Sequence, residues 1–213
     1  VSTLASVKTL LVGAVVGAGI SWPIKMAANI ELLAAQISVF TGSIESARRS
    51  ILELQNFSAI AAQPLETLVT QMRLLTTRGI GVDAAVRDLK ALAVMAAGSQ
   101  EEFEQLTKAF ADVKSANRLY GDEMRQFKNT AFNPFVEIAK RTGETLDELK
   151  ARMEAGGISF GEVEAALLAS VSAGGLFHGM LEKISNTLIG QVHIAFTQFK
   201  QAILPLSELL LQP

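Results

Sequence analysis

Residues 157–161 are the segment whose residue types come closest to a catalytic motif. They read Gly-Ile-Ser-Phe-Gly and match the G-x-S-x-G pattern of serine hydrolases, whose serine follows a strand and is completed by acid and histidine partners. The preceding residues 146–155 predict a helix, and no aspartate follows Ser159. Ser159 and Glu162 instead have the spacing of a capping box, in which side chain and backbone of the two residues hydrogen bond reciprocally. We predict a helix start here, and no nucleophile.

Metal binding and acid–base catalysis have equally little support. The two histidines, His178 and His193, are fifteen residues apart, which supplies neither the ligand spacing of a zinc site nor a catalytic partner. We expect His178 to lie at a packed helix junction. The acidic run Glu101, Glu102 and Glu104 falls in the first turn of a predicted helix, where carboxylates complement the helix dipole. The sequence therefore predicts no metal, no cofactor and no enzymatic activity.

Charge and cysteine content exclude further classes of function. The 19 basic and 21 acidic residues leave a formal net charge of −2, so no overall field would attract a polyanion. Two basic pairs, Arg48-Arg49 and Lys140-Arg141, have phenylalanines between them but do not form a stripe, and contact with DNA stays an open question. The chain has no cysteine, which excludes disulfides, thiolate metal sites and a cysteine nucleophile.

An uncharged stretch from Thr9 to Ile24 allows two interpretations. Its sixteen residues would form about 24 Å of helix, short of the roughly 20 residues that span a bilayer. Gly13 and Gly17 would let two helices approach closely, in a membrane or in tight soluble packing. We expect self-packing or burial, with membrane insertion as the alternative. The candidate membrane residues are Leu10, Leu11, Val15, Val16, Ile20 and Trp22.

Neither Val1 nor Pro213 resembles a natural terminus, and we expect a fragment.

The elements that would position these residues are helices. Alanine, leucine, glutamate and lysine are common, and no run alternates between apolar and polar residues, so the predicted class is all-α. We expect long helices to flank a compact subdomain of short ones. The predicted segments are an apolar N-terminal segment (1–40), helical hairpins (41–118), the short-helix subdomain (119–175) and a C-terminal long helix (176–213). Proline, glycine and capping residues predict the helix boundaries within them. A first helix is expected from about Thr3 toward Ser21, and Pro23 either kinks it or starts the next, which continues to about Val39. Further helices are expected over 65–77, from Val82 toward Gly98 and over 123–128, and after Ser43, Ser99, Asn133, Thr145, Ser159 and Gly175.

Two apolar seams are the predicted surfaces for self-association. In the first, Ile44, Ala47, Ile51, Leu54, Ser58 and Ala61 recur at steps of three and four, as in helices that pack side by side. In the second, one continuous helix up to Pro205 would carry Leu181, Ile184, Leu188, Val192, Ala195, Phe199 and Ala202 along one face. We expect several copies to associate along these faces.

Several separated blocks, in order, resemble the tape measure proteins of tailed bacteriophages. The first blocks are Ala27-Ala28-Asn29-Ile30-Glu31, Thr41-Gly42-Ser43 with Ala47, and the helix at Pro64. The middle blocks run from Leu119 to Phe127 and from Asn133-Pro134-Phe135 through Thr142-Gly143 to Glu148-Leu149. The most specific blocks are Gly156-Gly157-Ile158-Ser159, Val163, Ala166-Leu167, and Gly174 to Lys183, followed by Ser185, Thr187 and Gly190. The resemblance covers roughly residues 27–201.

This resemblance implies a structural role without catalytic residues. The parent protein would be a helical ruler in the tail lumen that sets tail length, made in the host cytoplasm, and this segment would be a folded module near the tail tip. The implied partners are further copies of the chain, tail tube and tail tip or baseplate proteins, and tail assembly chaperones. The alternative is a membrane-active segment that inserts in the host inner membrane during genome ejection and helps DNA to pass.

Overall fold

The computed structural model describes the backbone of residues 21–187, 190–192, 194–195 and 197–198, with side chains from Asn29 onward. The described part contains helices and no strand, and an isolated antiparallel bridge pairs Arg118 with Ser159. The all-α prediction is therefore confirmed. The helices are α2 (Ser21–Thr41), α3 (Ile44–Ala61), α4 (Leu65–Thr77), α5 (Val82–Met95), α6 (Gln100–Ala116), α7 (Gly121–Lys128), α8 (Pro134–Thr142), α9 (Leu146–Glu154), α10 (Phe160–Val171) and α11 (Met180–Ser185).

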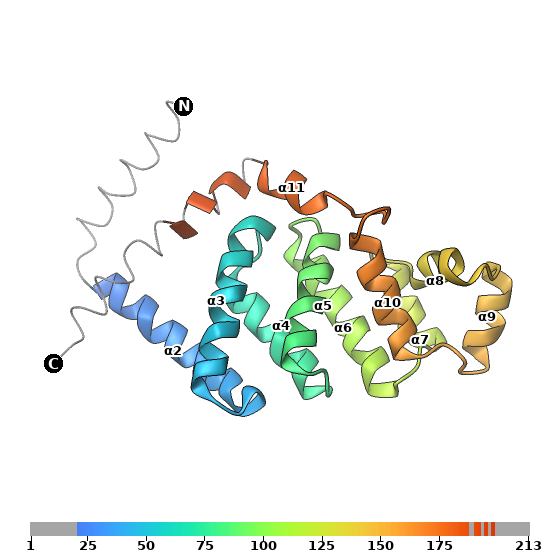
Figure 1. Ribbon diagram of the computed structural model, residues 1–213, viewed down its shortest axis with the longest axis horizontal. Coiled ribbons are helices and arrows are strands. Elements are labelled where there is room, and N and C mark those ends of the chain that lie inside the picture. Colours follow the sequence, from blue (N-terminus) through green and yellow to red (C-terminus); the bar gives the residue numbers. More distant parts are fainter. Residues whose placement is uncertain (1–20, 188–189, 193, 196, 199–213) are drawn as a thin grey trace.

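The helices form an elongated array (Figure 1). Helices α2 to α6 lie side by side and reverse direction at each turn, and the short helices α7, α8 and α9 lie at the end farthest from α2. Helix α10 returns from that end and packs against α5 and α8, and α11 then crosses back over α3 and α5. Segments distant in sequence thus meet at α10 and α11.

One apolar core connects these helices. It extends from Leu33 in α2 to Phe177 after α10. Phenylalanine rings fill its centre: the rings of Phe110 and Phe160 join α6 to α10 with centroids 5.0 Å apart, and Phe127 meets Phe132 edge to face at 5.4 Å. Such ring pairs add to the stabilisation that burial of their area gives. Buried aromatic side chains therefore join α10 to α6 and hold α7 against the loop before α8.

Local capping signals set most helix boundaries as predicted. Helix α4 begins after Pro64 and ends before Arg78, over the predicted residues 65–77. Thr145 with Glu148 and Ser159 with Glu162 both form the predicted capping boxes. Pro134 occupies the first turn of α8, and Gly143 ends that helix with a φ of 76°, a left-handed conformation that favours glycine.

The predicted capping box at Ser99 is only half formed. The Ser99 hydroxyl accepts from the backbone N–H of Glu102 at 3.2 Å, as predicted. The Glu102 carboxylate, however, accepts from the backbone N–H of Ala131 at 2.6 Å instead of returning to the N–H of Ser99. That N–H is satisfied by the carbonyl of Ala96 at 2.8 Å. Glu102 therefore ties the start of α6 to the loop before α8.

The prediction of a single long C-terminal helix was wrong, because α11 ends at Ser185. Ser185 and Thr187 each donate a side-chain hydroxyl to the carbonyl three residues earlier, which competes with the next helical hydrogen bonds. The backbone of Gly190 then lies so close to α11 that a Cβ there would meet the Ile184 carbonyl oxygen at 2.2 Å. Helical backbone resumes only after this break.

Candidate functional site

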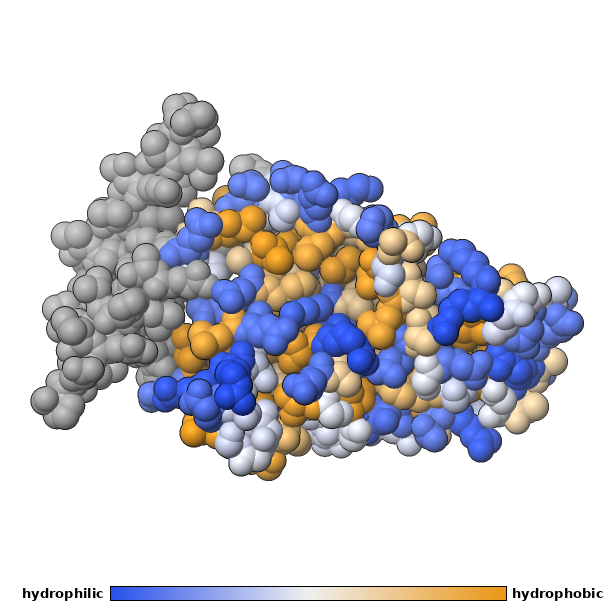
Figure 2. Space-filling view, in the orientation of Figure 1, coloured by the Kyte–Doolittle hydropathy of each residue, from blue (hydrophilic) through white to orange (hydrophobic). Residues whose placement is uncertain are grey.

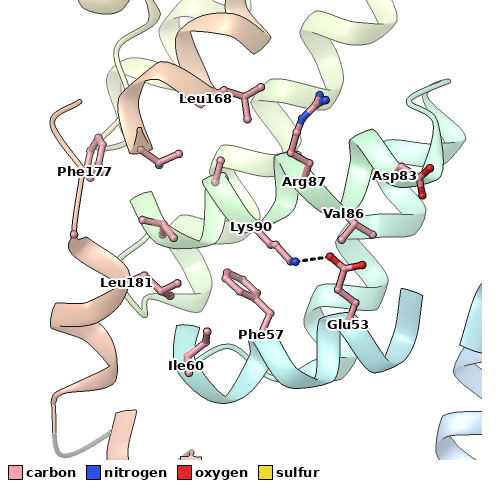
Figure 3. Close-up of a pocket in the computed structure, with 14 residues that line it drawn as sticks. Glu53, Phe57, Ile60, Asp83, Val86, Arg87, Lys90, Leu168, Phe177 and Leu181 are labelled. Atoms are coloured by element: carbon pink, nitrogen blue, oxygen red, sulfur yellow. Dashed lines mark hydrogen bonds and ion pairs between the residues drawn. The ribbon is translucent and has the colours of Figure 1, made fainter. Parts of the chain in front are cut away.

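A surface hollow lies along α3 and α5. Its volume is about 800 Å³, and it is bordered by α3, α5, α10, the chain after α10, and Leu181 of α11 (Figure 3). Figure 2 shows apolar surface over these elements. The apolar lining comprises Phe57, Ile60, Val86, Ala91, Val94, Leu168, Val171, Phe177 and Leu181, and the charged side chains are Glu53, Asp83, Arg87 and Lys90.

The ion pair between Lys90 and Glu53 bridges α5 and α3 inside the hollow (Figure 3). The Lys90 ammonium lies 2.5 Å from Glu53 Oε1 and 5.8 Å from the centre of the Phe57 ring. Both side chains keep partial contact with solvent, so the pair contributes at most about 1 kcal/mol to stability. It joins the two helices without leaving an uncompensated charge.

A second, smaller hollow of about 490 Å³ adjoins the first at Glu53 and Asp83, which line both. Its other lining residues come from the end of α2, from α3 and from the start of α5: Phe40, Thr41, Ser46, Arg49, Ser50 and Val82. The two hollows thus follow α3 from the α2–α3 turn to the region of α11.

The chain after α10 is shaped to close one side of the large hollow. A Cβ at Gly175 would meet the carbonyl oxygens of Ala169 and Ser170 at 2.3 Å, so the chain turns back against the end of α10 at a position that excludes any side chain. The Phe177 N–H donates to the Ser170 carbonyl at 2.9 Å, and its ring is buried. The turn at Gly175 therefore places Phe177, which lines the hollow, in this wall.

Beside the hollow, a buried carboxylate lies between α5 and α10. The Asp88 side chain is fully buried, and its Oδ1 accepts from Nε and Nη2 of Arg87 at 3.0 and 2.9 Å. The same Nη2 donates to Glu164 of α10 at 2.5 Å. Burial raises the pKa of Asp88 to about 7; the hydrogen bond and charge of Arg87 act against this rise, and Glu164 adds to it.

Sequence reasoning missed this cluster, although a signal was present. Asp88 lies on the apolar face of α5, between the buried residues Ala85 and Leu92 at helical spacing. An acid on such a face needs a buried partner. Glu164 of α10, which binds the same guanidinium, is 77 residues from Arg87 in sequence, so this contact could not be assigned from one helix.

The predicted self-association residues lie in different environments. Ile51 and Leu54 are fully buried and belong to the chain's own core, and Ile184 is also buried. Ile44 is 48% exposed, and Leu181 is partly buried at the large hollow. Within one chain, the first seam therefore packs α3 against α2, α4 and α5.

Some predicted residues lie outside the described ones: Gly13, Gly17, Leu188 and Phe199 of the self-association set, and Leu10, Leu11, Val15, Val16 and Ile20 of the membrane set. Trp22 is in the backbone of α2, and its side chain is not described.

Residues considered for catalysis or metal binding have structural surroundings. The Ser159 hydroxyl accepts from the N–H of Glu162 at 3.3 Å and lies 3.2 Å from the Glu162 carboxylate, as expected of a cap. His178 is exposed, which corrects the expectation of a packed junction: the neighbouring Phe177 enters the core instead. In the described ranges, no cluster of three or more histidines or acids could hold a metal ion, and no helix is long and apolar enough to cross a membrane.

The family comparison decides between the general classes of function. The sequence model of a family described as tape measure protein matches residues 23–208. The chain belongs to the tape measure protein family. No curated protein and no solved structure matches. The resemblance expected from the ordered sequence blocks is thus confirmed, and the match covers the described residues from Pro23 onward. Tape measure membership makes the chain a structural component of a phage tail, located in the virion tail.

Proposed function

We propose that this tape measure segment is a folded module that packs inside the tail near its tip, and that the extended ruler lies elsewhere in the parent protein. The observation that carries the proposal is the side-by-side packing of α2 to α10 around one core. A ruler converts residue number into length most directly when the chain is one continuous helix that advances about 1.5 Å per residue. In this segment, by contrast, the residues form separate helices that pack against one another.

The helix lengths show how little of the chain's length points along one axis. The longest described helix, α2, has 21 residues and spans about 31 Å. The chain reverses at the turns after α2, α3, α4 and α5, so successive helices run back along one another instead of adding end to end (Figure 1). Each residue of the module therefore adds far less to a tail axis than a residue in a rod.

An in-frame deletion in the phage gene tests this proposal. Removing residues 29–187 would shorten tails by about 1.5 Å per deleted residue if the segment were a rod-like part of the ruler. We expect a smaller change in the length of completed tails, measured by electron microscopy, together with fewer completed tails. A shortening proportional to the deleted residues would contradict the proposal. Crosslinking in purified tails should place the segment beside tube or tip proteins.

Association of copies is part of the same proposal, because a rotationally symmetric tube favours several chains side by side. Apolar side chains exposed on α2 and at the start of α3 are the candidate contacts: Leu32, Val39 and Ile44 are 57, 83 and 48% exposed. We expect a concentration-dependent oligomer in sedimentation experiments, weakened by V39D. The matched control is L146D, since Leu146 is also an exposed apolar residue, at 55%, but lies at the far end, on α9. Equal effects of both substitutions would contradict this surface.

Membrane insertion during ejection remains the second candidate because of the uncharged run at Thr9 to Ile24. The last residues of this run, from Ser21, belong to α2. A peptide of residues 1–28 added to liposomes should then give an oriented helix and dye leakage, whereas a segment that serves only in packing should give neither. The control is the double variant V15K/V16K, because two charges in the centre of the run oppose insertion.

A further inference from the structure

The contact between α5 and α10 contains two carboxylates and one guanidinium. Asp88 is fully buried, Glu164 is 26% exposed, and Arg87 between them is 50% exposed. Arg87 donates two hydrogen bonds to one oxygen of Asp88 and one to Glu164. One cation thus serves two acids that come from different helices, so full ionisation leaves a net negative charge at a buried helix contact.

The second oxygen of Asp88 explains how the cluster can be neutral. Asp88 Oδ2 is buried and has no hydrogen-bond partner among the described residues. A buried anionic oxygen without a partner is costly, whereas a protonated one becomes a donor that can face the Glu164 carboxylate. A single proton on Asp88 therefore balances the cluster: one neutral acid, one carboxylate and one guanidinium.

The other charged groups near α5 do not compensate Asp88. On α3, Glu53 is paired with Lys90 of α5, and Asp83 lies exposed at the start of α5. Within the described part of the chain, no charged side chain of α4, α6 or α11 interacts with Asp88. The protonation state of Asp88 is therefore set by burial, Arg87 and Glu164.

We propose that the Arg87–Asp88–Glu164 cluster is a proton-dependent joint between α5 and α10. With the proton bound, the two helices are held through the shared guanidinium. When Asp88 loses its proton, the two carboxylates repel one another across the contact, and α10 loosens from α5. Because α10 contributes Leu168 and Val171 to the large hollow and leads directly into Phe177, the joint also controls one wall of that hollow.

The pH window follows from the direction of the pKa shift. Asp88 has an ordinary value of 3.8 and a value of about 7 in the folded chain, so folding favours the protonated form. The stabilisation is complete below pH 3.8 and is lost as pH rises through about 7. The joint is therefore closed in mildly acidic solution and loosens above neutrality.

Distance measurements between α4 and α10 test the joint in the full 213-residue chain. Because the chain has no cysteine, T70C and A165C introduce two spin-label sites without background labelling. Thr70 is exposed on α4, which packs against α5, and Ala165 is partly exposed on α10. We expect the distance distribution to widen between pH 6 and pH 9. Carboxyl NMR should show Asp88 titrating near neutrality.

Three substitutions separate the joint from a general effect of pH. D88N imitates the protonated acid and should keep the distribution narrow up to pH 9. E164Q removes the repelling partner and should also keep it narrow, although Asp88 still titrates. D83N makes the same change in charge on the exposed part of α5 and should leave the wild-type response intact. Widening in D88N equal to that of the wild type, or a carboxyl titration of Asp88 near 3.8, would overturn the proposal.

Discussion

The position that a Cβ atom on Gly175 would take lies 2.3 Å from the carbonyl oxygen of Ser170. The obstruction is backbone, not the flexible end of a side chain, so it can be relieved only by moving the chain away from α10. That movement would stretch the 2.9 Å hydrogen bond from the Phe177 N–H to the same carbonyl and withdraw the Phe177 ring from the core.

G175A should therefore destabilise the fold, by about 1–3 kcal/mol as in other overpacked sites. The measurement is urea unfolding followed by circular dichroism. G161A is the matched control, because a Cβ there meets nothing closer than 3.9 Å and the residue lies inside α10. We expect G161A to be neutral or stabilising by up to about 1 kcal/mol, as alanine favours helix. Equal losses in both variants would show that close approach at Gly175 is not the cause.

L54A should cost about 2–5 kcal/mol, because Leu54 is fully buried on α3 and its truncation leaves a cavity in the core. I44A should change the unfolding free energy by less than about 1 kcal/mol, since half of that side chain already contacts solvent. Both residues belong to the same predicted seam. Comparing the unfolding free energies of the two variants in chemical denaturation shows which part of the seam packs within the chain's own core. Similar costs would contradict this division.

S159A should lower stability by about 1 kcal/mol, the usual cost of removing a serine cap. The lost interaction is the hydrogen bond from the Glu162 N–H to the Ser159 hydroxyl at the start of α10. S172A, which removes an exposed hydroxyl bonded to the Leu168 carbonyl at the other end of α10, is the comparison and should cost less. Thermal unfolding would measure both. A larger loss for S172A would contradict the capping role.

Acid should weaken two of the helix starts. Burial alone would raise the pKa of Glu162, but the N–H of Ser159 and the guanidinium of Arg152 outweigh it and hold the pKa below its ordinary value of 4.5. The N–H and hydroxyl of Thr145 likewise lower the pKa of Glu148. A lowered pKa stabilises the fold above the ordinary value and loses that contribution as pH falls through the folded value.

The double variant E148Q/E162Q should therefore lose less stability than the wild type when the pH falls from 6 to 3. The two glutamines cannot titrate, so their share of the acid dependence disappears. Urea midpoints across this range provide the measurement. An unchanged acid slope in the double variant would show that these caps do not contribute to it.

Helix boundaries that depend on adjacent residues could be predicted from the sequence, whereas contacts between segments distant in the sequence could not. Pro64 and Arg78 fixed α4 at its observed limits because proline and the cation–glycine order act locally. The long helix after Gly175 was mispredicted because apolar periodicity continues through Ser185 and Thr187, while their hydroxyls take up the backbone carbonyls. Glu102 has the spacing of a capping box, but its carboxylate accepts a hydrogen bond from the backbone N–H of Ala131, which lies outside α6.

The candidate site shows the same limit. Leu181 was predicted as a self-association residue from its helical period, but the period did not show that it lines the large hollow, where α11 crosses α3 and α5. The pairing of Arg87 with Glu164 depends on α10 returning to α5 after α6 and three short helices. A helical period describes which face is apolar, and only the folded chain determines what that face contacts.

The return of the chain over α3 also has a mechanical consequence. Both α2, the first described helix, and α11, the last named one, pack against α3 (Figure 1). Tension applied along the polypeptide would therefore pass through these three helices, and α7, α8 and α9 at the far end would carry no load until α11 detached. In a single-molecule stretching experiment the module should yield first at α11, and the distal helices should unravel only in a later step.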